Sequence, residues 1–289
     1  MSKNNSTSKI AFQGVQGAYS HIACMAVCPE HEPLAKSRFS GMISAVQEKQ
    51  ADMAMVPVEN STAGRVSDIH HILPESGLHI IGEHFQPVEH RLLGIKGARL
   101  EDITEVHSHE QGLAQCRKTL ATLNIKPVIH PDTAGAAKDV AARQDKSVGA
   151  IASSLAADIY GLDVLKQDIN DEGANTTRFL LMAREAKWPH STEIPAMTTM
   201  IFRVRSVPAV LYKALGGFAT NGINLTKLES YIRPGIAESA QFYMDVQAHI
   251  DDPAMRQAME ELHFYCIRDE VHVLGTYPAS PDRAAVDRT

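Results

Sequence analysis

The sequence predicts an α/β chain in two parts: a larger α/β domain with largely parallel strands, then a smaller α+β domain of the ferredoxin-like βαββαβ order. Short apolar runs alternate with helix-period stretches over residues 9–185. The composition changes near residues 186–195, where Pro189 and Pro195 indicate a linker. From residue 197 the pattern becomes strand, helix, strand, strand, helix, strand. We therefore expect domains at residues 9–186 and 197–278.

In the first part, each expected strand is a short apolar run and each expected helix has an apolar face. Strands are expected at Lys9–Gln13, Asp52–Val58, Leu78–Phe85, Glu105–Ser108, Pro127–His130, Val148–Ala152 and Thr177–Met182. Helices are expected at Ser20–Cys28, Gly41–Gln50, Val66–Leu73, Gln111–Leu123, Ala134–Ala142 and Ser153–Tyr160. A turn-rich stretch at Gly94–Gly97 suggests a crossing between two lobes, and a cleft between lobes is a common place for a small-molecule site.

In the second part, apolar residues at helical spacing and prolines in the first helical turn support both expected helices. Leu211, Leu215 and Phe218 share one face of the first helix, which follows Pro208. The expected elements are the strands Thr199–Val204, Asn224–Tyr231, Ser239–His249 and Val271–Leu274 and the helices Pro208–Ala219 and Pro253–Cys266.

Charge and hydropathy exclude several classes of partner. The formal charge of −6 leaves no basic stripe for a nucleic acid, and no apolar run approaches the roughly 18 residues that span a bilayer. The N-terminal residues are polar, without the apolar core of a signal peptide, and the four cysteines have no disulfide-framework spacing. We therefore expect a cytoplasmic protein with reduced thiols.

No metal site is expected from the cysteines or the fourteen histidines. Cys24 and Cys28 lie four apart, which places them on one helix face, but no second ligand pair has a matching spacing. They are interpreted as small core residues. His70-His71 and His107-Ser108-His109 lack the spacing of zinc-binding helices.

Three segments place polar side chains where a strand ends or a helix begins. Residues 12–20 run from a strand through Gly14 and Gly17 into a helix, whose free N–H groups suit a small carboxylate better than a nucleotide. Residues 56–64 end a buried strand in a dense set of donors and acceptors, and residues 108–116 begin a helix with Ser108-His109-Glu110-Gln111. A fourth cluster, residues 175–179, leads into an apolar strand, where a turn and a surface ion pair are the competing interpretation.

Taken together, these segments resemble the prephenate dehydratase family over essentially the whole chain. The T-R-F signature is met by Thr177-Arg178-Phe179, the V-P-x-E-N segment by Val56–Asn60 and the S-H-x-Q…Q-C pattern by Ser108–Cys116. The resemblance implies a two-lobed, periplasmic-binding-protein-like catalytic domain with its site in the cleft, followed by a ferredoxin-like ACT regulatory domain. It also implies a monofunctional member, since no chorismate mutase helix bundle precedes Lys9.

The resemblance implies a set of site residues and no cofactor. Thr177 is tied most directly to catalysis, and the remaining catalytic candidates are Arg178, Asn60, Ser108 and Gln115. The substrate-binding candidates are Gly17, Ala18, Tyr19, Ser20, Glu59, Ser61, Thr176 and Phe179. Glu59 has an equally good interpretation as a structural acceptor for nearby backbone N–H groups.

The chemistry implied by the resemblance explains these residue types. Prephenate loses its ring carboxylate as CO2 and its C4 hydroxyl as water, and aromatisation supplies the driving force. Poor solvation around the departing carboxylate favours the loss of its charge as CO2. The departing hydroxyl needs a hydrogen-bond donor, and we assign this role to Thr177. The side-chain carboxylate remains charged, and Arg178 offers it a bidentate fork, so both side chains are expected to point into one pocket.

In the second domain the resemblance implies an L-phenylalanine effector site at a dimer interface between ACT domains. Two motifs match imperfectly: no glycine follows Pro208, and Tyr231-Ile232 separates Ser230 from Arg233-Pro234. The effector candidates are Ala209, Val210, Leu211, Asn221, Gly222, Ile223, Asn224, Glu229 and Ser230. A homodimer or homotetramer formed through the ACT domains is expected.

Two alternatives stay open. One is arogenate dehydratase, which performs the same elimination on a substrate with an amino group in place of the keto group. The other is a non-catalytic amino-acid sensor, against which the intact Thr177-Arg178-Phe179 argues, since a protein that only binds needs no leaving-group donor.

Overall fold

The computed structural model describes residues 8–171, 173–189, 194–232 and 240–283. The chain divides into two compact units, one of residues 1–66 and 85–179 and one of residues 67–84 and 180–289. This division assigns residues 67–84 to the same unit as the C-terminal part of the chain. The boundaries 9–186 and 197–278 therefore stay a prediction. No helix in the described ranges is both long and apolar enough to cross a membrane.

The first sheet has the strand order β2-β1-β3-β11-β5, with β4 paired to β3. The strand β1 lies between β2 and β3 and is parallel to both. The strands are β1 (Lys9–Gln13), β2 (Glu32–Lys36), β3 (Met53–Asn60), β4 (Gly64–Arg65), β5 (His79–Pro87) and β11 (Thr176–Ala183). The accompanying helices are α1 (Tyr19–Val27), α2 (Phe39–Gln47), α3 (Ser67–Ile72) and the short 3₁₀ helix η1 (Leu73–Glu75). The division between the two units falls within β11 and directly after His84 in β5.

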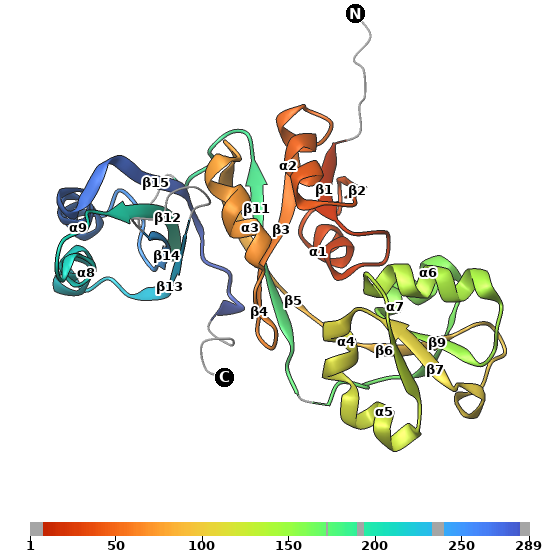
Figure 1. Ribbon diagram of the computed structural model, residues 1–289. Helices are drawn as coiled ribbons and strands as arrows, with labels where there is room; N and C mark the ends of the chain where they lie inside the picture. The colour runs from red at the N-terminus through yellow and green to blue at the C-terminus, as the bar shows by residue number, and fades with distance from the viewer. Residues whose placement is uncertain (1–7, 172, 190–193, 233–239, 284–289) are drawn as a thin grey trace, which may run out of the picture. The chain divides into compact units, whose positions relative to one another are not determined.

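The second sheet has the order β10-β6-β9-β7-β8. The strand β7 is parallel to β8 and β9, whereas β6 is antiparallel to β9 and β10. Its strands are β6 (Arg91–Gly94), β7 (Glu105–Ser108), β8 (Lys126–Ile129), β9 (Val148–Ala152) and β10 (Asp163–Lys166). Its helices are η2 (Leu100–Asp102), α4 (Glu110–Gln115), α5 (Arg117–Leu123), α6 (Thr133–Arg143) and α7 (Ser154–Tyr160) (Figure 1).

Helices cover both faces of the second sheet, which explains its continuous apolar strands. Leu93 and Ala150 belong to a core shared with α6 and α7. Their strand neighbours Leu92 and Ile151 belong to a separate core shared with α4 and α5. Successive residues of a strand point to opposite faces, so a sheet covered on both faces needs apolar residues at every position.

The C-terminal sheet confirms the predicted βαββαβ order. Its elements are β12 (Ala196–Val204), α8 (Val210–Thr220), β13 (Leu225–Tyr231), β14 (Gln241–Val246), α9 (Pro253–Tyr265) and β15 (Cys266–Pro278). The sheet order is β13-β14-β12-β15, with antiparallel pairs throughout. Both helices pack on one face, where Phe202, Phe218 and Met255 form part of the core. The fold class predicted from the sequence is therefore confirmed: a two-lobed α/β part followed by a ferredoxin-like ACT-like part.

Several elements differ from the prediction. The strands β2, β6 and β10 were not predicted, because β2 and β10 are half-exposed edge strands and β6 lies beside turn-forming glycines. The helix expected at Gln111–Leu123 is two helices, since the backbone leaves the helical region at Cys116 (φ −115°, ψ 13°). The expected start of a strand at Ser239 lies outside the described residues.

Candidate active site

A cavity of about 390 Å³ lies in the N-terminal unit and is lined from both lobes. The four segments that the sequence singled out contribute to it, at the α1 start, the end of β3, α4 and the start of β11, and the start of α6 contributes as well. Its lining residues are Gln13, Gly14, Ala18, Tyr19, Ser20, Phe39, Pro57, Asn60, Val66, Val88, His90, His109, Gln111, Gly112, Gln115, Pro131, Asp132, Thr133, Thr177 and Phe179.

Asn60 is held in one orientation at the end of β3. Its Oδ1 accepts hydrogen bonds from the backbone N–H groups of Thr62 at 3.0 Å and Ala63 at 2.8 Å. Such a turn between a side chain and the backbone is typical of the end of a strand. It fixes which end of the Asn60 amide is the oxygen, because a backbone N–H can only donate and therefore needs an acceptor. The Asn60 Nδ2 group must therefore donate, and it donates to Asn175 Oδ1 at 2.7 Å and to Thr177 Oγ1 at 3.0 Å.

This orientation propagates along a chain of hydrogen bonds. Because Asn175 accepts through Oδ1, its Nδ2 donates to Gln115 Oε1 at 2.7 Å. The same oxygen lies 2.9 Å from His90 Nε2, which must carry the ring proton. The Tyr19 hydroxyl donates its one hydrogen to the Glu89 carbonyl oxygen at 2.8 Å, and the unprotonated His90 Nδ1, which lies 3.0 Å from the hydroxyl oxygen, can only share that hydrogen.

Burial keeps the histidine of this chain neutral. His90 is 2% exposed, and burial lowers its pKa to about 4, although the hydrogen bond with Gln115 acts in the opposite direction. Burial also raises the pKa of Tyr19 well above its usual range. Near neutral pH the chain from Tyr19 to Thr177 therefore consists of uncharged donors and acceptors in a fixed order.

Thr177 occupies the end of this chain. Its Oγ1 accepts from Asn60, which leaves its own hydrogen available for a ligand in the cavity. Accepting one hydrogen bond polarises a hydroxyl and strengthens the bond it donates. The arrangement gives the cavity a neutral, oriented hydroxyl donor.

The position of the Arg178 side chain differs from the one expected. Its side chain is 2% exposed, does not line the cavity, and donates to Glu59 Oε1 at 3.2 Å. Adjacent residues of a strand point to opposite faces, so Thr177 and Phe179 share the cavity face of β11 and Arg178 lies on the other. The expectation that Thr177 and Arg178 point into one pocket is therefore wrong, and Glu59 serves as a structural partner of the guanidinium.

Other candidates support the site without lining the cavity. Ser108 is fully buried and donates to the Ile151 carbonyl oxygen at 2.7 Å. Ser61 and Thr176 bind each other, since the Ser61 N–H donates to the Thr176 carbonyl at 2.9 Å and the Ser61 Oγ accepts from the Thr176 N–H at 3.0 Å. These contacts tie β11 to the turn that carries Asn60.

Gly17 is needed for close packing of the two lobes. Its φ is +86°, and a Cβ at this position would come within 2.8 Å of the Ala156 backbone. The Gly17 carbonyl also accepts from the Ser153 hydroxyl at 2.6 Å. Gly17 thus positions the start of α1, from which Ala18, Tyr19 and Ser20 reach the cavity.

Sequence reasoning missed part of the lining. Asn175, which stands in the polar cluster before β11, joins Asn60 to Gln115, and His90 joins Gln115 to Tyr19. The start of α6 also lines the cavity, and its signal was present in the sequence, because Asp132 caps the helix by accepting from the Gly135 N–H at 2.6 Å. His90 lies in the short loop between β5 and β6, where spacing alone does not distinguish it from a core histidine.

In the ACT-like part, the effector candidates lie at separate places. Ala209 precedes α8 with φ +59°, and Asn221 caps its other end by donating to the Gly217 carbonyl at 2.7 Å. Eleven helical residues separate these ends, roughly 16 Å at 1.5 Å per residue. Within one chain, Ala209, Val210 and Leu211 are therefore distant from Asn221, Gly222, Ile223 and Asn224.

The remaining effector candidates lie on β13. Glu229 is in β13 and pairs with Lys227 at 3.0 Å, and Ser230 follows it. A cavity of about 340 Å³ lies at the α8 start, and Val210 is the one effector candidate among its described lining residues.

The fold and the site define a class before any comparison: a two-lobed α/β protein with a polar, uncharged hydrogen-bond chain in its cavity and a ferredoxin-like C-terminal part. The family model described as prephenate dehydratase matches residues 10–187. The chain therefore belongs to the prephenate dehydratase family, a family of dehydratases.

Individual relatives agree on the family and differ in named activity. The chain is 47% identical over 277 residues to a bifunctional N-acyl-homoserine lactone acylase/prephenate dehydratase of Komagataeibacter europaeus, covering 95% of this chain and 97% of the relative. It is 39% identical to arogenate dehydratase 2 of Petunia hybrida, covering 96% and 74%. Among solved structures, prephenate dehydratase of Arthrobacter aurescens in complex with L-Phe has a TM-score of 0.84 at 29% identity, covering 97% and 98%.

Proposed function

We propose that this protein converts prephenate to phenylpyruvate, water and CO2, with Thr177 donating a hydrogen bond to the departing C4 hydroxyl. The observation that supports this role is the bond from Asn60 Nδ2 to Thr177 Oγ1 at 3.0 Å, which leaves the threonine hydrogen available to a ligand in the cavity. An alcohol is a poor acid near neutral pH, so Thr177 acts as a positioned donor that stabilises the leaving oxygen.

The apolar part of the cavity suits the loss of CO2. Phe39, Pro57, Val88 and Phe179 line it together with the polar chain. An ionised carboxylate is poorly solvated beside such groups, whereas neutral CO2 is not penalised. The departing carboxylate and the departing hydroxyl would thus meet different surroundings in one cavity.

The direct test is incubation of the purified protein with prephenate and, separately, with arogenate, followed by identification of the products. Phenylpyruvate from prephenate supports the proposal, and phenylalanine from arogenate alone supports the arogenate dehydratase alternative, which is the named activity of the Petunia hybrida relative. Binding of either compound without product formation would support the non-catalytic sensor.

Variants at residue 177 test the assigned donor. Thr177→Ala removes the hydroxyl and should lower kcat by about 10²-fold or more, within the range of a positioned donor. Thr177→Ser retains the hydroxyl and should keep part of the activity. Equal rates in the two variants would remove Thr177 from the mechanism.

A second candidate activity is hydrolysis of N-acyl-homoserine lactones. It is favoured by the 47% identical relative, which carries acylase and dehydratase in one name. Incubation with an N-acyl-homoserine lactone and detection of the free fatty acid tests it. If both activities are present, Thr177→Ala tells whether they share the cavity.

We further propose feedback regulation by L-phenylalanine through the C-terminal part, in a cytoplasmic homodimer or homotetramer. Support comes from the Arthrobacter aurescens relative, whose structure was determined with L-Phe, and from the separation of the effector candidates within one chain. In a dimer, Asn221–Asn224 of one copy could meet Ala209–Leu211 of another. Titration with L-phenylalanine tests this, and unchanged activity and thermal stability at millimolar ligand would refute it.

A further inference from the structure

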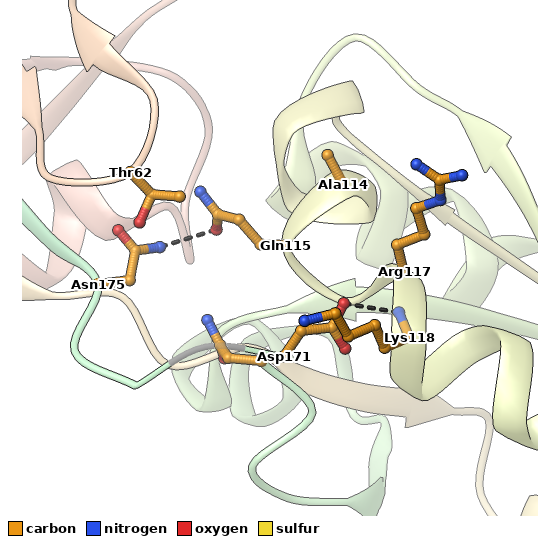
Figure 2. Close-up of a pocket in the computed structure, with 8 residues that line it drawn as sticks. Thr62, Ala114, Gln115, Arg117, Lys118, Asp171 and Asn175 are labelled. Carbon is orange, nitrogen blue, oxygen red and sulfur yellow. Dashed lines mark hydrogen bonds between the residues drawn. The ribbon is translucent and has the colours of Figure 1, made fainter.

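A second cavity of about 230 Å³ borders the candidate active site. Gln115 lines both cavities, so its side chain forms part of their common wall. Figure 2 shows Thr62, Gln115 and Asn175 toward one side of this cavity and Arg117 and Lys118 on the other. The complete lining is Thr62, Ala114, Gln115, Arg117, Lys118, Asn170, Asp171 and Asn175, all from the N-terminal unit.

The common wall offers a donor to both cavities. Gln115 Oε1 is occupied by Asn175 Nδ2 at 2.7 Å and by His90 Nε2 at 2.9 Å. Its Nε2 makes no recorded hydrogen bond to the described part of the chain. A carboxamide fixed through its oxygen presents its two N–H hydrogens to a ligand acceptor.

The two cavities differ in charge. Among its described lining residues, the larger cavity contains Asp132 but neither Lys nor Arg, and burial keeps His90 neutral by lowering its pKa to about 4. The smaller cavity contains two cations, Arg117 and Lys118. A dianionic ligand therefore finds fixed positive charge on only one side of Gln115.

Asp171 lines the same cavity and offsets one of the two positive charges, so one net positive charge remains among its described lining residues. Its Oδ2 accepts from the Lys118 backbone N–H at 2.6 Å and its Oδ1 from the Thr119 N–H at 2.8 Å, so both oxygens serve the first turn of α5. Burial acts to raise the pKa of Asp171, but these hydrogen bonds, a further hydrogen bond with the Thr119 side chain and the nearby Lys118 charge together hold the pKa below its usual range, so the carboxyl stays ionised. No ion pair of the Arg117 or Lys118 side chain is recorded within the residues that the structure describes.

We propose that the smaller cavity is the subsite for the carboxylate that the substrate retains, with Arg117 as its principal cation and Gln115 Nε2 donating to the adjacent keto oxygen. This assignment rests on the proposed function, because prephenate carries one carboxylate that leaves and one that stays. The ring lies in the larger cavity beside Thr177, and the pyruvyl arm passes Gln115. Arg117 takes the role that Arg178, buried on the other face of β11, does not fill.

The test compares Arg117→Gln with Arg143→Gln, which removes an exposed arginine from α6 of the same lobe. Loss of one charge-assisted hydrogen bond should raise the KM for prephenate at least about tenfold in Arg117→Gln. Its kcat should stay within about threefold of the parent, since Arg117 touches no reacting atom, whereas Arg143→Gln should match the parent in both. Phenylpyruvate retains the same carboxylate, so its inhibition constant should rise with the KM.

The outcomes separate the two proposals. A parent protein that forms no phenylpyruvate from prephenate overturns the proposed function and this subsite with it. An active parent, together with Arg117→Gln that keeps the parental KM and the parental inhibition by phenylpyruvate, overturns the subsite alone. Thermal unfolding of each variant shows whether it is folded, and Lys118→Gln provides a second variant with an expected threefold to tenfold rise in KM.

Discussion

Replacing Asn60 with aspartate tests the order of protons in the candidate site while keeping the shape of the side chain. Asn60 Oδ1 would still accept from the backbone N–H groups of Thr62 and Ala63. The second oxygen of the new carboxylate would face Asn175 Oδ1 and Thr177 Oγ1, to which the amide now donates at 2.7 Å and 3.0 Å. Thr177 would then donate to this carboxylate and no longer to the ligand.

The expected magnitudes follow from these contacts. The bond to Thr177 is reversed, whereas the bond to Asn175 Oδ1 is lost and leaves two acceptor oxygens facing each other, so the free energy of unfolding should fall by about 1–3 kcal/mol. Loss of a positioned donor should lower kcat by about 10²-fold or more at neutral pH. The new carboxylate would accept from the backbone N–H groups of Thr62 and Ala63 and from the Thr177 hydroxyl, and hydrogen bonds to the charged form lower the pKa of a carboxyl group. The new side chain should therefore stay ionised, and the loss of kcat in Asn60→Asp should persist between about pH 7 and pH 5, relative to the parent.

Phenylpyruvate formation from prephenate, measured across this pH range, is the assay. Asn124→Asp is the matched control, because it makes the same chemical change in the same compact unit at a residue that is exposed at the left-handed end of α5. A folded Asn60→Asp protein whose kcat stays within threefold of the parent at neutral pH would refute the assigned direction of the bond to Thr177.

Three further predictions concern stability. Arg178→Met leaves Glu59 without its guanidinium partner at 3.2 Å and should lower the free energy of unfolding by about 3 kcal/mol, measured by urea denaturation. His90 has its folded pKa lowered from 6.5 to about 4, so as pH falls below about 6.5 the unfolded state binds a proton that the folded state does not. The parent should therefore lose about 3 kcal/mol relative to His90→Gln between about pH 6.5 and pH 4, and parallel stability curves would contradict the assigned burial effect. Ala209→Gly should stabilise the protein by about 1 kcal/mol, because Ala209 has φ +59°, and an unchanged melting temperature would argue against strain there.

The fold class could be predicted from the sequence because an apolar run or a helical periodicity lies within a single helix or strand. Runs such as Val148–Ala152 are apolar at every position, and this pattern predicts a strand covered on both faces. The strand β2 carries no such signal, because it has no fully buried residue and two of its five residues are exposed. Its place in the sheet depends on its parallel pairing with β1, a contact between distant residues.

Prediction of the candidate site from the sequence was limited in the same way, because side-chain directions and long-range contacts decide it. The segments around Thr177, Asn60 and Gln115 were predicted to belong together, and the structure joins them through hydrogen bonds. The alternation of β11 was also readable from the sequence, and it would have assigned Arg178 to the face opposite Thr177. The family motif joins Thr177 and Arg178 as neighbours in sequence, but neighbours in a strand point to opposite faces.

The sequence by itself determined the family, the two-part α/β and ferredoxin-like order, and the polar segments at strand ends, because motifs and periodicities lie within short stretches of chain. Only the tertiary structure decided that His90 and Asn175 connect Tyr19 to Thr177, and that Gln115 separates a cavity whose described lining has neither Lys nor Arg from one that contains Arg117 and Lys118. These features depend on side chains that lie far apart in sequence and act on one another only when folding places them within hydrogen-bonding distance and away from water.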